Sequence, residues 1–325
     1  MSGAGLPGLP YLAPWCRVVQ AEDKVVLEYA QRIVALEGGA AVRLVPAVLP
    51  LLDGTRTVDE IVRVLGEPVR PAVENVLSAL SDCGLLVEGP PLPADEPLPF
   101  AGAATLLATL HPTSNAVTEA ADALRGCSAA VAGGSSAGLE VARLLRASGV
   151  AVEFAAGPVA GVDLTVCAPS VGELARLRIW NEHALDAALP WLQLLPFDGR
   201  YGAVGPLFLP GDTCCHECFR LRRAANLDGG AELALVEDAP ASYPAAPAVD
   251  ALAAAVAAQL ALGWLVFGDH HAPAAMYALE LVPSITLTLH HVHRVPRCPV
   301  CSALAGAAPS LPWHKEMPLA QAARA

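Results

Sequence analysis

The chain has 325 residues, of which 54% are hydrophobic and 16% are charged, and its formal net charge is -12. This composition excludes an intrinsically disordered chain, because disorder accompanies low hydrophobicity and high charge. The excess of Asp and Glu over Lys and Arg also argues against a nucleic-acid partner, whose phosphates attract positive charge. The length is sufficient for two domains of ordinary size.

The first residues contain neither the basic region nor the sustained apolar run of a signal peptide. The nine cysteines are then expected in a reducing cytoplasm, where paired cysteines serve metal binding or catalysis before disulfides. Residues 249–268 are apolar enough for a membrane span, but Asp250, Gln259 and many alanines favour a buried helix. We therefore expect a cytoplasmic protein without a membrane partner.

Proline divides the chain into two parts. Five prolines occur in the eleven residues 89–99, and such a run continues neither a helix nor a central strand. We expect an N-terminal domain, a stiff linker and a second domain, with a tail at each end. The expected bounds are 1–16 for the first tail, 17–88, 89–101 and 102–308 for the three main segments, and 309–325 for the last tail.

The N-terminal domain is predicted to be a small α+β unit of the winged-helix type. Turn residues separate three β-prone runs at 17–20, 25–29 and 32–36. Three helical patterns follow, and a final strand is predicted at 85–87. Thr57 and Glu60 form a capping box at the start of the second helix, and Pro71 lies in the first turn of the third. The helices are predicted at 40–52, 57–65 and from 71 to the stop at Cys83-Gly84.

The second domain is predicted to be a parallel α/β sheet with crossover helices, because strand and helix patterns alternate along it. Expected strands are 128–132, 150–154, 163–167, 191–195 and 204–209. Expected helices are 116–124, 139–148 and 171–189, together with the apolar stretch described above.

Two Cys-x-x-Cys pairs give the strongest chemical signal. Cys215 and Cys218 form the first pair, and Cys298 and Cys301 form the second. Two such turns complete a four-sulfur zinc site, which has no open coordination position and therefore serves structure only. Two separate redox or unpaired motifs are the alternative interpretation of these pairs. Within a metal site, His216 and Cys214 are alternative ligands.

A glycine-rich turn between a strand and a helix lies where nucleotide-binding folds hold phosphate. Gly133, Gly134 and Gly138 belong to it, but Ser135 replaces the middle glycine of the G-x-G-x-x-G pattern. The following strand ends without an acidic residue that could hold a ribose. We therefore expect a degenerate loop and no ATP, with a working nucleotide site as the alternative.

The histidines and the remaining nucleophiles suggest no catalytic group. His290, His291 and His293 could form a second metal site, but a surface strand end is the simpler interpretation. His270 and His271 are expected in a loop. No serine or cysteine nucleophile can be nominated from its spacing to a histidine.

Residues 17–88 resemble the PqqD-like peptide-binding domains of ribosomal-peptide modification enzymes. The resemblance rests on the order of elements, on LLDGTRTVDEI at 51–61 and on ALSDCGLL at 79–86. It implies that a leader peptide adds as a strand to the third strand and lies against the third helix, by β-augmentation. A DNA-binding winged helix is the alternative. The implied peptide-binding residues are Arg32, Val34 and Leu36 on the strand and Arg70, Val73, Glu74 and Leu77 on the helix.

Residues 102–305 resemble ThiF-like proteins, the fold of ubiquitin-activating and sulfur-carrier-adenylating enzymes. VDLTVCAPS, GAVGPLFLPGDTCCHECF and the closing RCPVCSA carry the resemblance. Three departures argue against adenylation. Ser170 replaces an aspartate of active members. Only a short segment separates Phe154 from Asp163, where active members carry a long insert. No cysteine lies between Cys218 and Cys298, where an acyl-accepting thiol would be expected.

A peptide-recognition element joined to a degenerate ThiF-like domain is similar to the partner proteins of YcaO cyclodehydratases in azole and thiopeptide biosynthesis. The resemblance implies a non-catalytic subunit that binds a precursor leader and presents the core segment to a YcaO enzyme, which forms azolines from Cys, Ser or Thr. Its partners would be the leader peptide and the YcaO enzyme, with a second copy of the chain as a further candidate. The alternatives are an ATP-dependent adenylating enzyme acting on a peptide or carrier-protein C-terminus, and a DNA-binding regulator.

Overall fold

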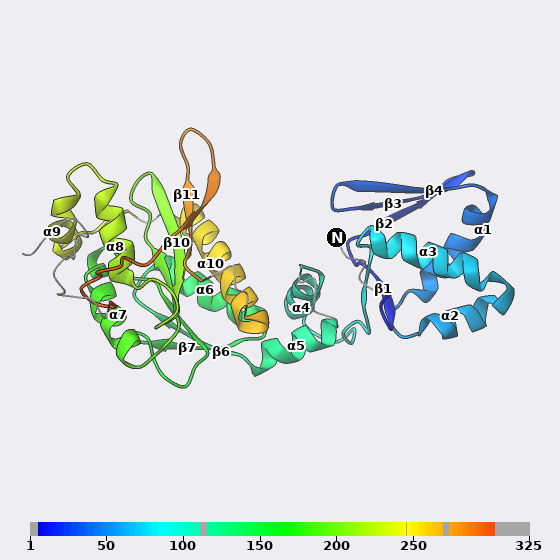
Figure 1. Cartoon of the computed structure of the whole chain (residues 1–325), viewed down its shortest axis with the longest axis horizontal. Helices are drawn as coiled ribbons and strands as arrows, with labels where there is room; N and C mark the ends of the chain where they lie inside the picture. Colours follow the sequence, from blue (N-terminus) through cyan, green and yellow to red (C-terminus); the bar gives the residue numbers. More distant parts are fainter. Residues whose placement is uncertain (1–5, 111–115, 245, 269–272, 303–325) are drawn as a thin grey trace, which may run out of the picture.

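The computed structural model describes residues 6–110, 116–244, 246–268 and 273–302. Figure 1 shows two bodies, each with its own sheet, joined by a helical segment. Buried residues between Val25 and Leu86 form the core of the first body, and two further clusters that begin at Phe100 form the core of the second. The mixed α/β architecture expected from the sequence is confirmed.

A three-stranded antiparallel sheet opens the first body, with β3 between β2 and β4. Val25 and Leu27 of the central strand are fully buried, whereas every residue of β2 is exposed. Because β3 is the central strand, β2 and β4 each have one edge without a partner strand within the described residues. The strands are β2 (Arg17–Gln20), β3 (Lys24–Tyr29) and β4 (Arg32–Glu37).

Three helices follow this sheet, of which the first contacts its strands and the second packs on the other two helices. The predicted capping box fixes the start of the second helix. The Thr57 N–H donates to the Glu60 carboxylate over 2.9 Å, and the Glu60 N–H donates to the Thr57 hydroxyl over 3.3 Å. The first helix is shorter than expected because its last residues form a 3₁₀ turn (Leu49–Leu51). The helices are α1 (Gly39–Val48), α2 (Val58–Leu65) and α3 (Arg70–Asp82).

The first tail contains a strand that the sequence analysis did not predict. Strand β1 (Pro10–Leu12) pairs antiparallel with β5 (Leu86–Glu88). Beside this pair, Gly54 and Gly89 pack so closely that a Cβ atom on Gly89 would lie 2.3 Å from the Gly54 Cα atom. Gly54, the glycine of the LLDGTR motif, has a positive φ of 73°, and a Cβ atom on it would lie 3.0 Å from the Gly89 Cα atom, so the close approach of the chain after β5 favours glycine there.

Two helices connect the bodies. Helix α4 (Leu98–Leu110) begins inside the segment expected to be a linker, and α5 (Val117–Gly126) packs against it. The sequence pattern did not predict α4. Its Phe100 is buried beside Gly149, and the Arg125 guanidinium of α5 lies over the Phe100 ring at 4.6 Å. The linker therefore ends as a helix that is docked on the second body.

The second body contains a seven-stranded sheet of order β12-β11-β10-β9-β8-β6-β7. Pairing is parallel over β7-β6-β8-β9 and antiparallel from β9 to β12. The expected parallel sheet is therefore correct for four strands only, because β10 follows β9 without a crossover helix. The strands are β6 (Ser128–Ala132), β7 (Ala151–Ala155), β8 (Leu164–Cys167), β9 (Trp191–Leu195), β10 (Tyr201–Phe208), β11 (Ala275–Glu280) and β12 (Thr286–His291).

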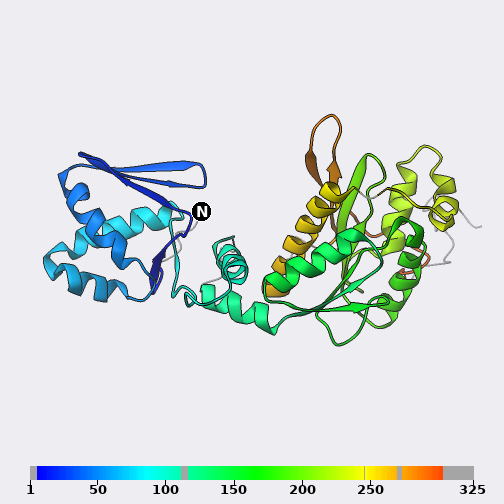
Figure 2. The same ribbon diagram turned by 180° about the vertical axis from the view of Figure 1, so that it is seen from behind.

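Five helices surround this sheet. Helix α7 is preceded by a 3₁₀ turn (Val171–Glu173), so the single helix expected at 171–189 is divided. Figure 2 shows α6 and α10 side by side, in agreement with their contacts. The helices are α6 (Ser136–Ala147), α7 (Arg176–Asp186), α8 (His216–Ala225), α9 (Leu233–Asp238) and α10 (Pro247–Phe267).

Helix α10 accounts for the apolar stretch noted in the sequence. Among the described residues, it is the one helix long and apolar enough to cross a membrane by length and composition. Ala254, Ala257 and Ala261 on its buried face are 0% exposed, and the helix packs against α6, β9 and β10. Close packing of small side chains in the core explains this composition.

Candidate functional site

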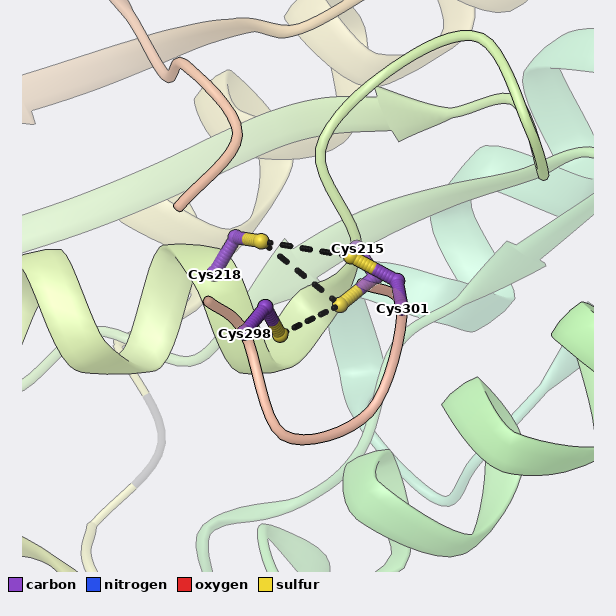
Figure 3. Close-up of side chains that lie close together, drawn as sticks. All are labelled: Cys215, Cys218, Cys298 and Cys301. Carbon is purple, nitrogen blue, oxygen red and sulfur yellow. Dashed lines mark hydrogen bonds between the residues drawn. The ribbon is translucent and has the colours of Figure 1, made fainter. Parts of the chain in front are cut away.

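The four cysteines of the two Cys-x-x-Cys pairs lie together, although about eighty residues separate the pairs. Figure 3 shows the thiols pointing toward one another, two from the start of α8 and two from the loop after β12. The Sγ atoms of Cys215 and Cys298 are 3.6 Å apart, and those of Cys218 and Cys301 are 3.5 Å apart. Tetrahedral zinc with Zn–S bonds of about 2.3 Å requires S···S distances of about 3.8 Å. The four cysteines could therefore hold one metal ion.

The surroundings of Cys218 favour its thiolate. Hydrogen bonds from the Cys215 thiol and from the Val295 N–H, over 3.3 Å, lower the pKa of Cys218. Both cysteines of the first pair also lie at the N-terminus of α8, where the helix dipole stabilises negative charge. Metal binding needs deprotonated sulfur, so the local structure favours the ligand form.

The two alternative ligands lie outside the cluster. Burial lowers the pKa of His216 to about 3, and its Nδ1 atom lies 2.7 Å from the Gln193 Oε1 atom. Burial also raises the pKa of Cys214 to about 12, which keeps its thiol protonated. The His216 N–H donates to Asn181 of α7 over 2.8 Å. His216 thus anchors the first pair to the sheet and to α7.

Two arginines that the sequence analysis missed hold the cysteine pairs together. Arg222 of α8 donates to the His293 and Arg294 carbonyls at 2.5 and 3.0 Å. Arg294 in turn donates to the Gly211 carbonyl over 2.8 Å and to the Cys301 carbonyl over 3.3 Å. No spacing rule could have identified these residues, because they act on backbone groups distant in sequence.

The glycine turn and Ser170 are brought together at the ends of β6 and β8. Gly133 has a positive φ of 104°, and a Cβ atom there would lie 2.3 Å from the Ala168 carbonyl oxygen. The Gly134 N–H donates to the Glu173 carboxylate over 2.8 Å, and the Ser170 hydroxyl donates to the same carboxylate over 2.9 Å. Gly138 lies in the first turn of α6. Glu173 is the residue here that sequence reasoning missed.

The three strand residues implied in peptide binding share one face of β4. The register pairs Leu36 with the buried Val25 and Val34 with the buried Leu27, so both point toward the helices. Arg32 lies on the same face by strand alternation and makes no ion pair among the described residues. Ile33 points to the opposite face and is 73% exposed.

Of the four helix residues implied in peptide binding, two are buried, one is half-buried and one is exposed. Val73 and Leu77 are 0% exposed and belong to the core, so they offer no surface to a peptide. Glu74 is exposed on α3. Arg70 is bound by Glu67, Asp59 and Glu74 at N···O distances of 2.9, 2.8 and 3.5 Å. Of these two cations, Arg32 is therefore the one that makes no ion pair among the described residues.

The histidines form no second metal group within the described part of the chain. His290 and His291 are exposed on β12, and His293 is exposed in the following loop. Only the four cysteines qualify there as a group of three or more possible ligands. His270 and His271 lie outside the described residues, as does the expected tail at 309–325.

No protein-family model and no curated protein matches the chain. Among solved structures, the heterocyclase TruD has 23% identity and a TM-score of 0.66, covering 91% of this chain and 43% of that chain. A heterocyclase in complex with substrate and cofactor has 24% identity and a TM-score of 0.65, covering 91% and 40%. E. coli MccB has 13% identity and a TM-score of 0.63, covering 95% and 99%.

The chain thus spans about two-fifths of the length of these heterocyclase chains and nearly all of MccB. The match to TruD leaves out 9% of this chain. The three-stranded sheet and its helices make up a larger share of the residues than that, so the match includes part of both bodies. The fold of this chain is therefore that of the heterocyclase and MccB structures.

Proposed function

We propose that this chain is a non-catalytic subunit that binds the leader of a ribosomally made precursor peptide. It presents the core segment to a separate YcaO cyclodehydratase, which forms azolines from Cys, Ser or Thr. The observation that carries the proposal is the fold shared with TruD, since the match includes part of both bodies of the chain. In this proposal the first body is a PqqD-like recognition element and the second is a degenerate ThiF-like domain.

The free edge of β4 is the proposed site for the leader. An edge strand presents unpaired N–H and C=O groups, so an extended peptide can add to it through backbone hydrogen bonds. Val34 and Leu36 would contact apolar side chains of the leader, and Arg32 would attract an acidic one. Arg70, Glu74 and the half-buried Val76 of α3 would border the added strand.

Tethering explains why such a subunit needs no catalytic residue of its own. Once the leader is bound, every reactive residue of the core becomes an intramolecular substrate for a docked enzyme. The effective concentration reaches about the millimolar range for a short flexible connection. The second body would then serve as the dock.

The metal proposed for the four cysteines is a structural zinc ion. Cys215, Cys218, Cys298 and Cys301 would supply all four positions of a tetrahedral shell, so no position is open for a substrate. Zinc would join the start of α8 to the loop after β12. Sites of this type contribute about 10 kcal/mol or more to folding at neutral pH.

Fluorescence anisotropy with a labelled leader peptide from a neighbouring precursor gene tests the proposal. We expect a dissociation constant of about 1 μM or lower, weakened about tenfold by Arg32→Glu. Arg63→Glu is the matched control, because Arg63 is an exposed cation on α2, which Figure 1 shows on the side of α3 away from the sheet. If no neighbouring leader binds, or if both variants weaken binding equally, the proposed site is wrong.

Adenylation of a peptide C-terminus is the second candidate, and the match to 99% of E. coli MccB favours it, since one solved MccB structure contains ATP. ATP–pyrophosphate exchange by the purified chain distinguishes the two functions. Exchange that depends on an added peptide and needs no second protein would replace the presenting role by an enzymatic one.

A further inference from the structure

The sheet of the second body has a topological switch point at β6. Strand β7 lies on one side of β6 and β8 on the other, so the connections leaving β6 and β7 run in opposite directions. Ligands of open α/β sheets bind at such a point, beyond the carboxyl ends of the strands. Backbone N–H groups at the start of the next helix are the usual donors to a phosphate there.

In this chain the Glu173 carboxylate lies at that position. It comes from the turn after β8 and accepts the Gly134 N–H at 2.8 Å, the Ser170 N–H at 3.0 Å and the Ser170 hydroxyl at 2.9 Å. Arg176 binds its other oxygen at 2.7 Å. Burial alone would raise the pKa of Glu173, but the N–H donors of Ser170 and Gly134, with Arg176, lower it to about 2. The group is therefore an anion at neutral pH.

Other donors of the turn are also bound within the chain. The Gly138 N–H donates to the Ser135 hydroxyl over 3.1 Å, and the Ser135 N–H donates to the Ala168 carbonyl over 3.3 Å. Ser135, which replaces the middle glycine of the nucleotide pattern, thus caps α6 with its own side chain. These backbone N–H groups thus donate to acceptors within the chain, whereas those of a nucleotide-binding turn donate to phosphate.

A cavity of about 300 Å³ beside the turn has the wrong charge for a phosphate. Its lining includes Ser136, Ser170, Tyr243 and Asp250, and no Lys or Arg side chain among the residues that the structure describes. The Asp250 carboxylate of α10 accepts the Ser136 hydroxyl at the start of α6. An entering phosphate would therefore meet the Asp250 carboxylate at the cavity wall and find the Gly134 and Ser170 N–H groups already bound to Glu173.

We propose that Glu173 is a built-in substitute for a ligand phosphate, which keeps the glycine turn ordered and excludes nucleotide phosphates from the second body. The inference is independent of leader binding, because it concerns only the switch point. It identifies Glu173, in addition to the Ser135 and Ser170 replacements, as the residue that determines specificity at this turn.

Thermal unfolding of the full chain with sodium pyrophosphate, at constant ionic strength and without magnesium, tests the proposal. We expect millimolar pyrophosphate to leave the wild-type Tm unchanged. Glu173→Ala should lower the Tm by about 2–6 °C through loss of the carboxylate contacts. Pyrophosphate should then raise the Tm of this variant, because the vacated donors bind it. Glu182→Ala, at an exposed position on α7, should behave like the wild type.

Two results would overturn the proposal. One is stabilisation of the wild type by pyrophosphate as strong as that of Glu173→Ala, and the other is a folded Glu173→Ala variant whose Tm does not respond to pyrophosphate. If Glu173→Ala does not fold, Glu173→Ser also vacates the donors, because its side chain is too short to reach them, and it keeps a polar group in the turn. A Tm increase with pyrophosphate in Glu173→Ser and not in the wild type supports the proposal, and its absence contradicts it.

Discussion

At the scale of single residues, Cys298 tests whether the four thiols act as one site. Its Sγ atom is fully buried and 3.6 Å from that of Cys215, so a serine there leaves three sulfur ligands at a site built for four. We expect about one zinc per chain in the wild type and its loss in Cys298→Ser, with a large decrease in Tm. Elemental analysis and thermal unfolding provide the two measurements.

Cys83→Ser is the matched control, because Cys83 is half-buried at the end of α3 and outside the cluster. It should keep its zinc. A wild-type chain without metal, or a Cys298→Ser chain that keeps its metal and its Tm, would contradict a four-sulfur site.

Single residues also mark how far the sequence predicts the site. The Cys-x-x-Cys spacing identified all four thiols, because each pair is a local turn whose geometry is known in advance. Glu173 and Arg294 were not predictable, because neither belongs to a motif. Their partners, Gly134 and Gly211, are fixed only when distant loops meet in the folded sheet.

At the scale of elements, β4 and β2 offer a comparison within one sheet, since both are edge strands. If the leader adds to β4, its backbone pairs with the free edge of that strand. We expect amides of Arg32–Glu37 to exchange more slowly with solvent deuterium when the leader is present, while those of Arg17–Gln20 remain unchanged. Hydrogen–deuterium exchange measured by mass spectrometry resolves the two strands.

Slower exchange on β2, or on α3 without β4, would place the peptide elsewhere and contradict strand addition at β4. The internal comparison matters because general stabilisation of the first body would slow exchange on both edges.

Helices and strands were predictable where the local sequence pattern alone favours the structure that the folded chain adopts. The strands β2 to β4 and the capping box of α2 follow from alternation and spacing. Strand β1 was missed because it has only three residues and begins with a proline, so it carries no period, and only its pairing with β5 makes it a strand. Helix α4 was missed because it is apolar around much of its surface and begins within the proline run, although proline is compatible with a first helical turn.

At the scale of the whole molecule, the separate cores of the two bodies predict separable domains. The first core uses buried residues between Val25 and Leu86, and the buried residues of the other two clusters begin at Phe100. A cut after residue 90 preserves the pairing of β1 with β5 and leaves α4 attached to the second body.

We therefore expect residues 91–325 to remain folded and to retain one zinc per chain, but to lose leader binding completely, because β4 is removed. Residues 1–90 should bind the leader with nearly the affinity of the full chain. Circular dichroism, elemental analysis and anisotropy provide the three measurements. If residues 91–325 lose both their cooperative unfolding and their metal, the bodies stabilise each other and the domain division is wrong. If residues 1–90 fold but bind no leader, recognition requires the second body as well.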